Sequence, residues 1–332
     1  MDAPWAGDSR TVDGTQIIWR GGKYLNPTGI LEQVDVVRLR LHLEFDAESV
    51  LPPGFSLQLR RELLQVGRLL LDRESFCRLF EPSLPADPMA IRRFQRPAPA
   101  FILKAGTMEE KIVCSGEDWQ MEVLFVGDGI PFIPDFIRVV QQLGQNGLYQ
   151  GRGRFVLIAA SSLGVSGEVA ELSLTSRAGT AQVPHMFPLA WLVETTRGAG
   201  NWRLEMMTPA RLVSHGKPLF HPDLPQLFPY ILRRVGAMLW HWGGCTNEID
   251  PQPLLAAAAR VVVPDNRLFW QDWKPLPGIP GVGGLGGISG TMVLSGPALD
   301  DIFWILGLGA VLHVGKGAAY GAGEYRLTGA EN

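Results

Sequence analysis

Alternating and helical spacings of apolar residues divide the first half of the chain into strands and helices. Residues 34–45, VDVVRLRLHLEF, alternate apolar and polar positions, which predicts a strand with one buried face. Residues 55–71 carry leucines at helical spacing, which predicts a helix. The same criteria predict extended segments at 99–104 and 119–126 and a helix at 134–143. Residues 144–160 are predicted to form a glycine-rich turn followed by a strand. The predicted order is βαββαβ.

The second half repeats this order. We predict a strand at 201–209, a helix at 224–242, extended segments at 258–265 and 288–296, a helix at 297–308 and a strand at 324–329. A short internal echo supports the duplication, because GRGRFVLIA at 151–159 and GAGEYRLTG at 321–329 each follow a predicted helix. We therefore predict an α+β protein with tandem ferredoxin-like domains.

The domain boundaries follow from these elements and from composition. We expect an N-terminal domain over 1–160, with an extension at 1–33, and a C-terminal domain over 201–332. Residues 161–200 hold clusters of serine, glycine and threonine, which favour a linker or hairpin insertion. Residues 275–287, PLPGIPGVGGLGG, are expected to form a mobile loop.

Composition excludes several classes of protein. A net charge of −3 and a pI near 6.1 argue against a protein that coats nucleic acid through bulk positive charge. No apolar run is long enough for a membrane span, and the start has no signal-peptide pattern, so we expect a soluble cytosolic protein. Cys77, Cys114 and Cys245 lie far apart, so neither a disulfide framework nor a zinc site is predicted.

The richest candidate motif is LHVGKGAAYGAGEYRL, residues 312–327, called here the glycine-rich segment. Glycines allow main-chain N–H groups to approach an anion, which favours a phosphate contact. Two nucleotide motifs are excluded: Ala310 occupies the first glycine position of a Walker A loop, and the GxGxxxG spacing differs from the Rossmann pattern. No nucleotide cofactor is expected. The alternative is that the glycines simply permit a tight, closely packed connection.

With the preceding helix and the terminal strand, this segment resembles the C-terminal signature of the RAMP superfamily, specifically the CRISPR endoribonucleases that process precursor crRNA. Further stretches share the resemblance: 92–103, 124–155, 207–219 and 269–273. The resemblance implies a RAMP/RRM-like fold in a prokaryotic cytoplasm, without a cofactor. It also implies metal-independent cleavage of repeat RNA, in which a 2′-OH attacks the adjacent phosphate to leave a 2′,3′-cyclic phosphate and a 5′-OH. The product's 3′ hairpin would stay bound.

A catalytic histidine is commonly found near the first helix in this family, yet none lies between Asp46 and Leu71. The nearest substitute is His42 on the first strand, where alternation places Arg38, Arg40 and His42 on the face opposite Leu39, Leu41 and Leu43. Helices cover one face of a ferredoxin-like sheet, so this row is expected on the open face. We predict that it reads phosphate and that His42 is a base or acid. The alternative is a solvated face with paired charges.

Further candidates surround the glycine-rich segment. His313, Lys316 and Tyr320 have side chains suited to acid–base or phosphate chemistry, although each is also compatible with a packed or solvated position. RNA contacts are predicted for basic and glycine residues of both halves: Arg38, Arg40, Arg60, Arg61, Arg152, Arg154, Gly315, Gly317, Gly321 and Gly323.

The sequence therefore predicts a metal-independent endoribonuclease whose partners are CRISPR repeat RNA and crRNA. The principal alternative is a non-catalytic RAMP that binds crRNA as a subunit of a CRISPR effector complex. The absence of a histidine near the first helix favours this alternative. A small-molecule enzyme using the glycines for a nucleotide is disfavoured by both failed motifs.

Overall fold

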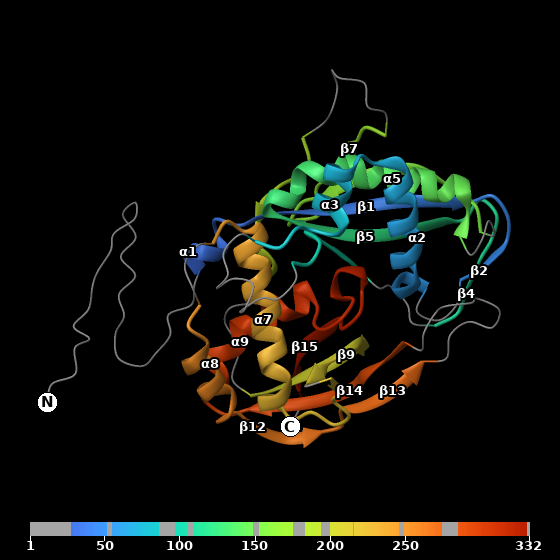
Figure 1. The fold of residues 1–332 in the computed structure, drawn as a ribbon. Coiled ribbons are helices and arrows are strands. Elements are labelled where there is room, and N and C mark those ends of the chain that lie inside the picture. Colours follow the sequence, from blue (N-terminus) through green and yellow to red (C-terminus); the bar gives the residue numbers. More distant parts are fainter. Residues whose placement is uncertain are drawn as a thin grey trace, which may run out of the picture.

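Two α+β domains lie one above the other in the computed structural model (Figure 1). The structure describes residues 28–51, 55–85, 97–104, 109–148, 153–174, 183–193, 200–214, 216–245, 249–273 and 285–330.

The N-terminal domain is an antiparallel sheet with helices on one face. Its strands are β1 (Asp35–Phe45), β3 (Phe101–Leu103), β5 (Asp118–Val126), β6 (Phe155–Leu163), β7 (Val169–Leu172) and β8 (Phe187–Pro188). They pair in the order β3-β5-β1-β6-β7, with β8 also on β1. The helices are α1 (Thr28–Leu31), α2 (Phe55–Leu70), α3 (Arg73–Phe80), η1 (Gly127–Phe132), α5 (Ile133–Asn146) and η2 (Leu189–Leu192). A small hairpin pairs β2 (Ser49–Leu51) with β4 (Lys111–Val113).

The C-terminal domain repeats this arrangement. Its main strands are β9 (Asn201–Ala210), β12 (Val262–Asn266), β13 (Phe269–Trp273), β14 (Leu285–Ser295) and β15 (Tyr325–Ala330). The order is β12-β14-β9-β15, with β13 also on β14. The other elements are β10 (Val213–Ser214), β11 (Lys217–Pro218), α7 (Leu224–Trp242), α8 (Pro251–Ala258), α9 (Leu299–Leu312) and η3 (Ala318–Tyr320). In both domains the first strand lies between the third and fourth strands of the βαββαβ unit, so the predicted tandem ferredoxin-like fold is confirmed.

Local sequence signals explain the elements that were predicted best. The side chains of Leu39, Leu41 and Leu43 are buried under α2 and α5, as the alternation of β1 requires. Helix α7 starts after Asp223, whose carboxylate accepts the amide of Gln226 while the Gln226 side chain caps the Asp223 amide. This reciprocal cap fixes the predicted start of the helix.

Other expectations need correction. Helix α9 continues to Leu312, four residues past its predicted end, and the short α3, α8 and β13 were not predicted. The predicted end of the 275–287 loop is wrong, because β14 already begins at Leu285. Residues 274–284 lie outside the described part of the chain. A Cβ on Gly287 would lie 2.9 Å from the main chain of Ala210, so glycine is needed there for β9 to approach β14.

Two hydrophobic cores cross the boundary between the domains. Val36, Ile102 and Leu124, from the first sheet, belong to the core built around α7 and α9. Conversely, Ala319 and Tyr320 belong to the core beneath α2 and α5. The glycine-rich segment is therefore anchored in the N-terminal domain.

Among the described helices, none has the length and apolar character needed to cross a membrane.

Candidate active site

The glycine-rich segment is held within the C-terminal domain by a second sequence motif, Thr208–Arg211, at the end of β9. The Thr208 hydroxyl donates to the carbonyl of Gly321 at 2.7 Å and accepts the amide of Glu324 at 2.9 Å. The carbonyls of Pro209 and Arg211 accept the amides of Gly323 and Lys316. The TPAR sequence in β9 and the segment about 110 residues later thus form one hydrogen-bonded unit.

The glycines shape this unit. Gly315 and Gly323 have φ of 90° and 66°, a region that favours glycine. A Cβ on Gly323 would lie 1.8 Å from the carbonyl oxygen of Val314, and one on Gly315 would lie 2.8 Å from that of Arg211. Close packing, the alternative considered from the sequence, therefore accounts for both residues. The RNA contacts of Gly315, Gly317, Gly321 and Gly323 stay predictions.

Tyr320 anchors the segment beneath α2. Its side chain is 5% exposed and packs edge-to-face on Phe101, with ring centroids 5.5 Å apart. The guanidinium of Arg60, on α2, lies 5.4 Å from the Tyr320 ring centroid. Burial raises the pKa of the Tyr320 hydroxyl, which therefore stays protonated at neutral pH.

His313 lies in a buried polar cluster. Its ring is fully buried, and neither ring nitrogen has a hydrogen-bond partner within normal geometry among the described residues. Its Nε2 lies 3.8 Å from a carboxylate oxygen of Glu324, which also forms an ion pair with Lys104 of the N-terminal domain at 3.3 Å. Burial, then the charges of Lys104 and Arg234, hold the pKa of His313 well below its usual range. His313 is a neutral interior group here, and its catalytic role stays a prediction.

This burial predicts a loss of stability in acid. Because the His313 pKa is lower in the folded than in the unfolded chain, stability is complete above the unfolded pKa of 6.5 and falls as pH drops below it. The slope from this group is at most about 1.4 kcal/mol per pH unit. Denaturant unfolding of wild type and His313→Asn at about pH 7.5 and about pH 5 measures it. We expect a smaller acid loss in the variant; equal losses would contradict this account.

The charged row of β1 lies on the face of the N-terminal sheet that α2 and α5 leave uncovered, as predicted; we call this the open face. Arg40 pairs with Glu122 at 2.7 Å, and Arg38 approaches the same carboxylate at 3.7 Å. His42 Nδ1 lies 2.9 Å from an Asp118 carboxylate oxygen. The row is therefore paired with acids from β5, as the alternative considered from the sequence expects, and phosphate reading by the row stays a prediction.

The sheet separates the predicted site residues into two groups. Arg38, Arg40 and His42 lie on the open face, whereas Arg60 and Tyr320 lie on the face covered by helices. The Lys104–Glu324 ion pair joins the domains at the end of the edge strand β3, and the Lys104 amide donates to the Glu122 carbonyl. An RNA that contacts both groups must therefore reach from one face of the sheet to the other.

Two basic side chains in and beside the glycine-rich segment are free to bind an anion. Lys316 and Arg211 are exposed, and neither has a side-chain ion pair or hydrogen bond to the described residues. They contrast with the arginines of β1, whose charges are already compensated. Arg61, on α2, and Arg154, before β6, are also exposed, but Arg61 already has an interaction partner; Arg152 lies outside the described residues.

The acidic partners were missed from the sequence. Asp118, Gln120 and Glu122 alternate along β5, opposite Glu44, His42 and Arg40 of β1 in the antiparallel register. The sequence DWQMEVLFV alternates polar and apolar residues, which could have identified these partners. In a ferredoxin-like sheet the first and third strands of the unit pair directly, so the polar residues of β5 lie beside those of β1.

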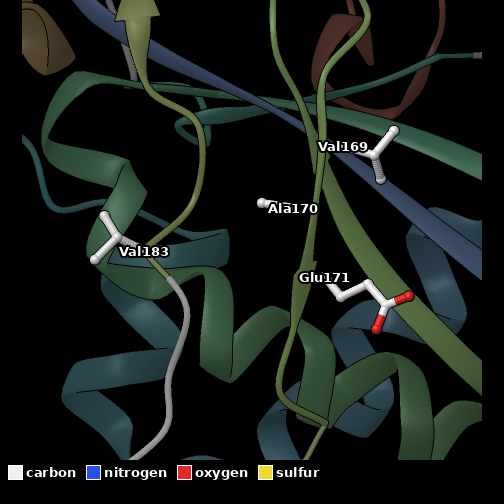
Figure 2. A pocket seen from close by; sticks show the side chains of 4 residues that line it. All are labelled: Val169, Ala170, Glu171 and Val183. Atoms are coloured by element: carbon white, nitrogen blue, oxygen red, sulfur yellow. The ribbon is translucent and has the colours of Figure 1, made fainter.

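The shallow hollow beside β7 is a less suitable site (Figure 2). Its lining residues, Val169, Ala170, Glu171 and Val183, are three apolar residues and one acid. A single carboxylate without a basic neighbour among them repels phosphate. In the described part of the chain, no group of three or more histidine, cysteine and acidic residues could hold a metal ion.

Two family models match the chain. One, described only as an N-terminal domain, covers residues 34–184, and the other, CRISPR-associated endoribonuclease Cas6, covers residues 204–325. No curated protein matches the chain.

Solved structures share the fold at low sequence identity. A Cas6 product complex is 14% identical with a TM-score of 0.50, over 88% of this chain and 99% of that one. A Thermus thermophilus Cas6 is 15% identical with a TM-score of 0.49, over 89% and 99%. A partial Cas6-RT-Cas1–Cas2 complex is 14% identical with a TM-score of 0.52, over 90% of this chain and 46% of the other. The two structures with TM-scores of 0.50 and 0.52 show that the chain shares the fold of Cas6 proteins. Residues 204–325, which carry most of the glycine-rich segment, match the family model of the CRISPR-associated endoribonuclease Cas6.

Proposed function

We propose that this protein cleaves CRISPR precursor RNA within its repeats, without a metal ion, and retains the 3′ hairpin of the product. The observation that carries the proposal is the open face, where a partly exposed histidine, paired with a carboxylate, stands in a row with two arginines. The proposed partners are repeat RNA and crRNA, with other CRISPR proteins as further candidates.

The chemistry needs a base, a proton donor and stabilisation of the phosphate. We assign the base to His42, whose side chain is 24% exposed and therefore reachable by a ribose 2′-OH. His42 takes the 2′ proton, the 2′ oxygen attacks the adjacent phosphorus, the bond to the 5′ oxygen breaks, and that oxygen takes up a proton from water. Arg38 and Arg40 stand beside His42 on the same face and would stabilise the charge on the phosphorane.

Further exposed cations are assigned to holding the RNA. Lys316, Arg60, Arg61 and Arg154 are exposed, and the unpaired charge of Lys316 makes it the strongest candidate for a phosphate contact. Retention of the hairpin would depend on these contacts because none of the four residues is assigned to the cleavage chemistry. His313 and Tyr320 would position the glycine-rich segment, since both are buried.

Removal of the Lys316 charge is expected to weaken RNA binding uniformly and to lower the salt dependence. For Lys316→Ala, the slope of log K against log salt should fall by about 0.7–0.9. Titration of labelled repeat RNA at several salt concentrations measures this slope. Lys111→Ala is the matched control, because Lys111 is exposed but already paired with Glu117 at 3.1 Å. An unchanged slope in Lys316→Ala would remove the phosphate contact.

Incubation of the purified protein with 5′-labelled repeat RNA in EDTA tests the function itself. We expect a shortened product that ends in a 2′,3′-cyclic phosphate, which acid opens and phosphatase then removes. RNA that is shifted in a gel but stays intact, with and without added Mg²⁺, would instead support the non-catalytic crRNA-binding subunit. Cleavage that depends on added Mg²⁺ would contradict the metal-independent chemistry.

A further inference from the structure

We infer that Asp118 is the positioning residue for His42: its carboxylate fixes the imidazole tautomer that exposes a basic Nε2. This inference rests on the proposed function, and it identifies a residue that the sequence did not single out. The juxtaposition that carries it is a single hydrogen bond across two strands, in which His42 Nδ1 lies 2.9 Å from Asp118 Oδ2.

The register of the sheet makes this contact specific. His42 stands directly opposite Gln120, and Glu44 stands opposite Asp118, so the His42–Asp118 contact is diagonal. A second hydrogen bond orients the carboxylate, because Gln120 Nε2 donates to Asp118 Oδ2 at 3.2 Å. Asp118 therefore has a fixed direction toward the imidazole instead of rotating freely in solvent.

The protonation states fit this role. Burial opposes ionisation of Asp118, yet the hydrogen bonds from His42 and Gln120, with the charges of His42 and Arg40, lower its pKa. An ionised carboxylate can only accept a hydrogen bond, so Nδ1 must carry the proton. In the neutral imidazole the lone pair then lies on Nε2, where it can accept a proton from a ribose 2′-OH.

Among the described residues, no other carboxylate is bonded to His42. Its charged and polar neighbours on the strands are Arg40 and Glu44 on β1 and Gln120 and Glu122 on β5, and its partner on β6 is the uncharged Ala159. Glu122 is held by Arg40 through two hydrogen bonds to one oxygen, at 3.2 and 2.7 Å. Glu122 is thus taken up by Arg40, and Asp118 is the carboxylate bonded to His42.

The test combines single-turnover cleavage with a direct view of the imidazole. In Asp118→Asn the side-chain amide can donate to Nδ1 and favour the wrong tautomer, so we expect a loss of about 10²-fold or more in rate with RNA affinity unchanged. Asp118→Glu should recover part of the rate. Long-range ¹H–¹⁵N correlation of the full chain should show His42 protonated on Nδ1 in wild type and shifted toward Nε2–H in Asp118→Asn.

Glu122→Gln is the control, because it removes a carboxylate from the same strand and face without touching His42. It should leave the His42 tautomer unchanged. If Asp118→Asn, shown by thermal unfolding to be folded, cuts at the wild-type rate while His42→Ala is slow, the inference is overturned and the proposed function stands. If the wild-type spectrum shows His42 protonated on Nε2, the inference is overturned whatever the rates. If wild type does not cleave, the proposed function fails, and Asp118 has no reaction to support.

Discussion

Replacement of His42 by alanine is expected to slow single-turnover cleavage of repeat RNA by about 10²- to 10⁴-fold, the usual contribution of a general base. The residue is partly exposed and bonded to Asp118, so it can meet substrate without a change in the fold. Only one side chain of the binding surface is lost, and RNA affinity should change by no more than about threefold. Rapid-quench cleavage and filter binding of the same RNA separate the two quantities.

His185→Ala is the matched control for this experiment. His185 belongs to the same domain but lies in the segment before β8, where its amide, and not its ring, donates to Ser162. Its cleavage rate should equal that of wild type. Equal rates for wild type and His42→Ala would remove the open face as the catalytic site and leave binding as its role.

Replacement of Tyr320 by alanine is expected to cost about 3–5 kcal/mol of unfolding free energy, as for other large aromatic groups in a core. The Tyr320 ring fills space between α2 and β3, where it contacts Phe101 and Arg60. Its loss leaves a cavity where the glycine-rich segment packs against the N-terminal domain. Urea unfolding monitored by circular dichroism gives the value.

Tyr320→Phe separates packing from chemistry. This variant keeps the ring and removes only the hydroxyl, whose raised pKa keeps it protonated. We expect stability and cleavage rate close to wild type. A rate loss of more than about tenfold in Tyr320→Phe, with stability retained, would show that the hydroxyl takes part in the reaction after all.

The sequence could predict the elements whose signals are local. Strand β1 alternates strictly, and the segment of α7 has a helical pattern of apolar residues, so both were predicted from neighbouring residues alone. The capping box at Asp223, which the structure shows, is a further local signal for the start of α7. The repeated βαββαβ order then determined the fold, because few topologies accommodate it. The alternation also placed His42 and the two arginines on the open face.

Burial of the glycine-rich segment could not be predicted in the same way. His313 and Tyr320 suit catalysis by residue type, but their environment depends on groups from distant parts of the chain. Lys104 lies 209 residues before His313 in the sequence, and Phe101 lies 219 before Tyr320. Likewise, the hydrogen bonds of Thr208 to the segment became visible only once β9 and β15 were paired.

The separation of the two groups of residues also required the structure. From the sequence, both the glycine-rich segment with its lysine and the row of arginines on β1 were predicted to contact RNA. The sheet places the arginine row on one face and Arg60 with Tyr320 on the other, with the Lys104–Glu324 pair at the end of the edge strand β3. Binding and cleavage are therefore assigned to different surfaces.

A crystal structure of the protein with repeat RNA that carries a 2′-deoxy nucleotide at the cleavage site tests this assignment most directly, because such RNA binds but lacks the nucleophile. We predict that the ribose at the cleavage site lies on the open face, with its 2′ carbon within about 4 Å of His42 Nε2. A cleavage site found instead beside Lys316 and Arg60, with His42 free of RNA, would contradict the account.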